Sequence, residues 1–170
     1  MSLKNLISEY ARYNAWANRT LIDYIRSKPE QTWYTAIPSS FSSLVKTANH
    51  ILATEEYWHS IITRTPPAHT RHFDEDPSGI EVFGALVRQS EELEELVCSY
   101  TEEELEATIE IINEWFSCAS PRYIYLQHLF NHSTYHRGQL VTIGRALGFT
   151  DAPMTDLNYM LVMRESTGVL

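Results

Sequence analysis

Three histidines recur at a spacing of four residues in the segment His128-Leu-Phe-Asn-His132-Ser-Thr-Tyr-His136. On an α-helix, residues four apart lie on one face about one turn apart, so two such imidazoles can point at one metal ion. His128 and His136 are separated by about 12 Å along the helix axis, so all three cannot bind a single ion. The spacing leaves two pairs open: His128 with His132, or His132 with His136.

A pair of helical histidines needs a third ligand from another segment, and His50 is the natural donor. It interrupts an apolar pattern in Ala48-Asn-His-Ile-Leu52, although a lone histidine in such a place is more often an ordinary core or boundary residue. Three neutral imidazoles with an open position are typical of a catalytic Zn²⁺, Ni²⁺ or Fe²⁺ centre. His59 follows nine residues later and points to the opposite side of a helix, so we do not expect it to serve this centre.

The hydrophobic pattern predicts the elements that must position these histidines. Apolar residues recur at intervals of three and four, which favours an all-α fold. We expect long helices over residues 3–27, 78–100 and 121–147, and another that is capped by Ser39 or Ser40 and ends near residue 63. A short helix over 156–164 is expected to seal the end of the bundle. Residues 101–104 predict one helical turn. The β-branched segment 107–118 predicts a short strand or an extended excursion before the last long helix.

Composition narrows the class of protein. The 170 residues are 44% apolar and predict one globular domain over 1–170. A formal charge of −9 argues against binding to nucleic acid. We find neither an apolar run long enough for a membrane span nor a secretory signal. The sequence has two cysteines, Cys98 and Cys118, which are too few for a disulfide framework. We therefore expect reduced thiols in a cytoplasmic protein.

A second group of histidines lies in a segment with the composition of a loop. His69 and His72 precede the acidic cluster Asp74-Glu-Asp76 and are flanked by prolines. These side chains could bind a metal adventitiously. A solvated connection between helices explains the composition better.

Three stretches together carry a recognisable pattern: Asn131-His132-x-x-x-His136-Arg-Gly-Gln139, Tyr13-Asn-Ala-Trp-Ala-Asn18 and His50-Ile-Leu-Ala-Thr-Glu-Glu-Tyr-Trp58. In this order, they resemble the signature, the first-helix pattern and the second-helix segment of the DinB family of bacterial four-helix-bundle proteins. The similarity spans nearly the whole chain. It implies an up-down-down-up four-helix bundle, in which a long crossover joins the second and third helices, and a homodimer formed by helix packing.

The resemblance also implies a ligand set. It selects His50, His132 and His136 as the metal ligands and leaves His128 as a pocket residue or a residue that orients a ligand. Some members of the family are thiol-dependent transferases or isomerases that use bacillithiol or mycothiol. The resemblance therefore implies a small-molecule substrate and a low-molecular-weight thiol as a second cofactor beside the divalent metal.

Polar residues of the signature are further candidates for the site. Asn131 and Gln139 could orient the ligands through hydrogen bonds. Arg137 could bind a carboxylate of the substrate or of the thiol cofactor, or it could form a salt bridge on the helix surface. The sequence does not choose between these roles.

The first helix carries further candidates. Tyr13, Asn14 and Trp16 could line the mouth of the site, with core packing as the alternative. No general base is evident, although Glu55 or Glu56 is conceivable. The favoured hypothesis is a metal-dependent transferase or hydrolase. The alternative is a non-catalytic, metal-binding dimeric bundle protein, which the resemblance links to DNA damage or stress.

Overall fold

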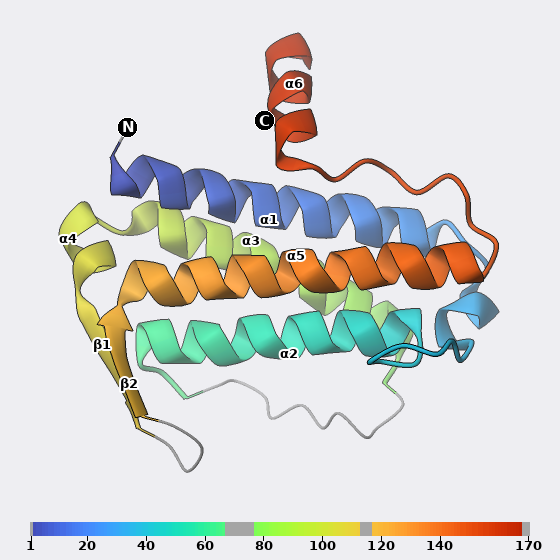
Figure 1. Ribbon diagram of the computed structural model, residues 1–170, viewed down its shortest axis with the longest axis horizontal. Coiled ribbons are helices and arrows are strands. Elements are labelled where there is room, and N and C mark those ends of the chain that lie inside the picture. The colour runs from blue at the N-terminus through green and yellow to red at the C-terminus, as the bar shows by residue number, and fades with distance from the viewer. Residues whose placement is uncertain (1, 67–76, 113–116, 168–170) are drawn as a thin grey trace.

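The computed structural model describes residues 2–66, 77–112 and 117–167, and its core is a bundle of four long helices (Figure 1). These helices are α1 (Leu3–Arg26), α2 (Leu44–Thr63), α3 (Gly79–Ser99) and α5 (Arg122–Ala146). α1 and α5 run in one direction and α2 and α3 in the other. α1 packs between α3 and α5, and α2 packs between the same two helices, so α1 and α2 lie diagonally opposite. The predicted up-down-down-up bundle is confirmed.

Serine caps define where three of these helices begin. Ser2 and Ser78 accept hydrogen bonds from the third residue beyond them, which starts α1 and α3 within one residue of the prediction. The prediction that Ser39 or Ser40 caps α2 is wrong. Ser43 accepts a hydrogen bond from the backbone N–H of Lys46 instead, and α2 begins at Leu44. Serine is a favourable cap at any of these positions, so residue type alone does not select one.

The segment between α3 and α5 forms a short helix and a hairpin. Thr101 and Glu104 form a capping box at the start of α4 (Glu102–Glu106). Strands β1 (Thr108–Ile112) and β2 (Ser117–Pro121) pair antiparallel. The predicted extended excursion is confirmed, and a second strand that the sequence did not indicate is paired with it. Residues 113–116 lie outside the described residues.

The last helix lies on the flank of the bundle. α6 (Leu157–Thr167) stands away from α1 in Figure 1, and its Met160 is buried against Tyr13 and Ala17. Leu161 and Met163 are 40% and 37% exposed. The prediction that this helix seals the end of the bundle is therefore wrong, because the connection after α5 returns along α1.

Two apolar clusters fill the bundle, one at each end. One contains Leu21, Leu52 and Leu86, and the other contains Ala11, Ile62 and Leu93. The short 3-10 helix η1 (Glu30–Tyr34) contributes Trp33 to the first cluster. Within the described ranges, none of the helices has the length and apolar character needed to cross a membrane.

Candidate metal centre

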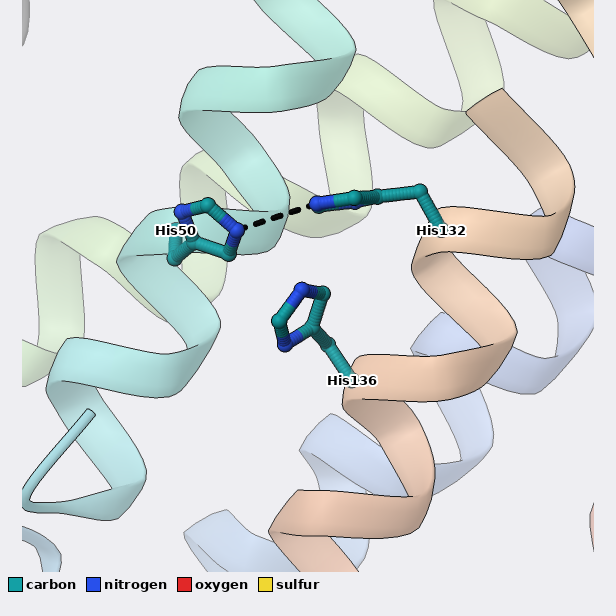
Figure 2. A group of neighbouring side chains, drawn as sticks. All are labelled: His50, His132 and His136. Atoms are coloured by element: carbon teal, nitrogen blue, oxygen red, sulfur yellow. Dashed lines mark hydrogen bonds between the residues drawn. The ribbon is translucent and has the colours of Figure 1, made fainter. Parts of the chain in front are cut away.

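Three histidines from two helices converge on the α2–α5 side of the bundle. His50 projects from α2, and His132 and His136 project from successive turns of α5 (Figure 2). Their nearest ring nitrogens all lie within 4.8 Å of one another. The Nε2 atoms of His50 and His132 are 3.0 Å apart. The structure thus brings together the three residues that the resemblance implies as ligands.

The donor set fits a divalent cation. Two nitrogen atoms that each lie about 2.0–2.1 Å from a metal ion in tetrahedral geometry are about 3.3 Å from each other. This is close to the observed separation of the two Nε2 atoms. When the two Nε2 atoms form a hydrogen bond, one of them carries the proton and only the other offers a lone pair. A cation would instead accept a lone pair from both nitrogens. Among the described residues, His132 Nδ1 is buried without a hydrogen-bond partner. No other His, Cys, Asp or Glu of the described chain joins the group.

Burial favours the neutral form of all three imidazoles, which is the form that binds metals. Burial and the neighbouring His136 lower the pKa of His50 to about 4. Burial, followed by the surrounding imidazoles, lowers the pKa of His132 to about 3. Burial also lowers the pKa of His136, against a hydrogen bond to Gln139 that raises it. All three rings therefore have a lone pair that can bind a metal at neutral pH.

Gln139 and Phe41 hold two of the rings in place. Gln139 Oε1 lies 2.8 Å from His136 Nδ1 and accepts its N–H, which leaves Nε2 as the free donor atom. The role predicted for Gln139 is consistent with this contact. Phe41 stacks on His50 with ring centroids 4.0 Å apart and meets His136 edge-on. Sequence reasoning missed Phe41, because it lies in an irregular serine-rich segment without periodicity.

His128 stays outside the group. Its ring centroid is 6.2 Å from that of His132, its edge contacts Trp58, and its side chain is exposed. Its position next to His132 leaves the role expected for it, as a pocket residue or a residue that orients a ligand, a prediction. Asn131 faces the other way and lines a groove of about 110 Å³ between α1 and α5, so the expectation that it orients a ligand has no contact to support it.

Arg137 is not a surface residue. It is only 3% exposed, and its guanidinium donates to the side chains of Asn14, Asn18 and Thr134. Of the two roles considered for Arg137, the surface salt bridge is therefore wrong. The hydrogen bonds of Arg137 point into the bundle, because Arg137 lies about 100° around the helix from His136.

The first-helix candidates also lie away from the histidines. Asn14 is buried and donates to Glu55. The Tyr13 hydroxyl donates to the carbonyl of Thr155, and Trp16 contacts Tyr159 of α6. Their contacts correspond to the core-packing alternative rather than to the mouth of the site.

The remaining candidates also lie apart from the three-histidine group. Glu55 is fully buried among hydrogen-bond donors, so it is not placed as a general base. Burial raises its pKa, and hydrogen bonds and the positive charge of Arg137 counteract this effect. His59 pairs with Gln89, as expected for a residue that serves another face. His69 and His72 lie outside the described residues.

Comparison with known proteins agrees with this architecture. The family model described as "DinB family" matches residues 1–166. Protein DinB of Bacillus subtilis (strain 168) is 24% identical over 164 residues, covering 91% of this chain and 92% of the relative. A DinB-like protein from Bacillus cereus has a TM-score of 0.67 at 21% identity, covering 84% of this chain and 91% of that one. A DinB-like protein from Bacillus subtilis has a TM-score of 0.66 at 18% identity, covering 89% of this chain and 98% of that one. The chain belongs to the DinB family.

Proposed function

We propose that this protein is a metal-dependent enzyme in which His50, His132 and His136 bind one divalent cation and leave a position for a small-molecule substrate. The observation that carries the proposal is the convergence of three neutral imidazoles, with no fourth protein ligand among the described residues. Closed structural sites commonly have four protein ligands, whereas catalytic sites have three. Zn²⁺, Ni²⁺ and Fe²⁺ all suit such a donor set.

The reaction class that we propose is thiol S-transfer or hydrolysis. A divalent metal in this site would supply Lewis acidity that lowers the pKa of a coordinated thiol or water. Gln139 orients His136 for this task, and Phe41 fixes the plane of His50. His128 and Trp58 border the site next to His132 and would contact a bound substrate. A low-molecular-weight thiol such as bacillithiol is the co-substrate that we propose.

Metal analysis of the purified protein tests the site. We expect about one equivalent of divalent metal in the unmodified protein and its loss in the single variants His50→Ala, His132→Ala and His136→Ala. His128→Ala and His59→Ala are matched controls, because both remove a histidine outside the group. Metal content that is undiminished in all three ligand variants would overturn the site.

A turnover assay separates enzyme from binding protein. The metal-loaded protein is incubated with an electrophile and either bacillithiol, mycothiol or no thiol, and separately with ester and amide substrates. Conjugation that requires both thiol and metal supports S-transfer. Cleavage that requires metal alone supports hydrolysis.

The second candidate is a non-catalytic metal-binding protein of the damage or stress response. One observation favours it: within the described chain, the metal-binding group contains no carboxylate that could act as a base. Absence of turnover with every thiol and ester, in protein that holds a full equivalent of metal, would support this candidate.

The assembly and location that we propose are a homodimer in the cytoplasm. Tyr159, Leu161, Val162 and Met163 of α6 are between 37% and 52% exposed, which is typical of a helix that packs against a partner. Both cysteines are free. Light scattering during gel filtration tests the dimer, and a monomer mass of about 20 kDa across a range of concentrations would overturn it.

A further inference from the structure

A layer of buried polar side chains crosses the middle of the bundle, between the two apolar clusters. It draws on all four long helices and comprises Asn14, Asn18, Glu55, Ser90, Ser133 and Arg137. None of these six side chains belongs to a residue more than 3% exposed. A buried polar group is tolerated when it is hydrogen-bonded, and a fully bonded network specifies one arrangement of the elements that carry it.

The layer is an ion pair bridged by amides. Glu55 Oε1 accepts from the side-chain amides of Asn14 and Asn18 at 2.8 and 2.9 Å and from the Ser133 hydroxyl at 3.1 Å. Glu55 Oε2 accepts from Ser90. The amide oxygens of Asn14 and Asn18 then accept from Arg137 Nη1 at 2.8 and 2.9 Å. Each asparagine therefore links the carboxylate to the guanidinium, and the charges are compensated.

The layer shares its helices with the metal ligands. Ser133 and Arg137 directly follow His132 and His136. α5 therefore carries two rows of side chains, separated by about 100° around the helix axis. One row points at the histidine group and the other into the layer. Glu55 lies five residues after His50 on α2 and is about 140° around that helix. Both helices that supply ligands are thus anchored on their inner faces.

Small rotations decide whether such ligands converge. Side-chain tips lie roughly 5–6 Å from a helix axis, so a rotation of about 20° moves a ring nitrogen by about 2 Å. That displacement equals the length of a metal–nitrogen bond, about 2.0–2.1 Å. Apolar contacts alone are not directional and tolerate such a rotation. Hydrogen bonds are directional and restrict it.

We propose that Glu55, Ser133 and Arg137 are positioning residues, which fix the rotation of α2 and α5 and so hold the three histidines at metal-binding separation. This inference rests on the proposed metal site and adds a role for residues that touch neither metal nor substrate. It also explains why Arg137, next to a proposed ligand, points away from the site.

The experiment removes both buried charges together with the double variant Glu55→Gln/Arg137→Met, because removing only one would leave the other unpaired. Co²⁺ affinity is measured by chelator competition, and coordination geometry by the visible absorption of bound Co²⁺. We expect an affinity at least about tenfold weaker and an altered absorption spectrum. The control is Val97→Ala, which truncates a fully buried residue of α3 in one of the apolar clusters. It should keep both properties despite a lower melting temperature.

Ser133→Ala is the milder variant, and it tests the positioning role if the double variant does not fold. It deletes one hydrogen bond to Glu55 beside His132 and leaves both charges in place. An affinity and spectrum equal to those of the unmodified protein in a folded variant would overturn the positioning role alone. Failure of the unmodified protein to bind Co²⁺, Zn²⁺ or Ni²⁺ would overturn the proposed function and the positioning role with it.

Discussion

Gln139 determines which nitrogen of His136 faces the centre, because its side-chain oxygen accepts the Nδ1 proton. We expect Gln139→Ala to weaken metal affinity by about 10- to 100-fold, as is usual when the partner of a ligating histidine is removed. Gln139→Glu keeps an acceptor and should bind more tightly than Gln139→Ala. Thr142→Ala is a control on the same helix, because its exposed hydroxyl bonds the carbonyl of Gly138 and, within the described residues, is not part of the histidine group. Equal affinities for Gln139→Ala and this control would contradict the prediction.

The histidines also predict how the metal-free protein responds to acid. The pKa values of His50 and His132 in the folded state, about 4 and about 3, lie below the ordinary value of 6.5. The unfolded chain therefore takes up protons first as the pH falls, and stability declines below about pH 6.5. We expect a loss of about 1–2 kcal/mol for each of these histidines between pH 7 and pH 5.

Urea unfolding of chelator-treated protein at the two pH values measures this loss. The double variant His50→Gln/His132→Gln should lose much less stability than the unmodified protein between pH 7 and pH 5. His59→Gln serves as the control, because it removes a histidine that pairs with Gln89 instead. The same pH dependence in all three proteins would show that the cluster does not titrate as expected.

At the scale of elements, we expect alanine substitutions at two glycines to change the free energy of unfolding in opposite directions. Gly138 lies within α5, and a Cβ added there would meet no atom within 4 Å. We expect Gly138→Ala to raise the free energy of unfolding by about 0.5–1 kcal/mol, because glycine costs a helix backbone entropy. A Cβ at Gly79, the first residue of α3, would lie 3.0 Å from both Trp33 and Val45. We expect Gly79→Ala to lower stability by about 1–3 kcal/mol through overpacking.

Urea titration of both variants checks this contrast. Metal affinity should not change in Gly138→Ala, although the position lies between Arg137 and Gln139. A destabilised Gly138→Ala, or a Gly79→Ala as stable as the unmodified protein, would show that the local packing differs from the structure.

At the scale of the whole molecule, a bound metal would link α2 to α5, because His50 comes from one helix and His132 and His136 from the other. A ligand at 100 times its dissociation constant stabilises a protein by about 2.7 kcal/mol. For a chain of this size, that corresponds to a rise in melting temperature of about 5–10 °C. Calorimetry with and without chelator measures the shift. His136→Ala should show no shift, and an equal shift in that variant would place the metal elsewhere.

The sequence by itself determined the helical class, the four long helices and the His-x-x-x-His face of α5, because these depend on periodicities of three and four that are local to one helix. It also placed His50 on a second helix. It could not choose between His128 and His136 as the partner of His132 from spacing, because that choice depends on how α5 is rotated and placed against α2. It missed Phe41, and neither role that it left open for Arg137 placed this residue in the core. The contacts of both residues come from segments far apart in the chain. Only the tertiary structure decided which face of each helix is buried, and therefore which polar residues meet in the core and which histidines meet at the proposed metal site.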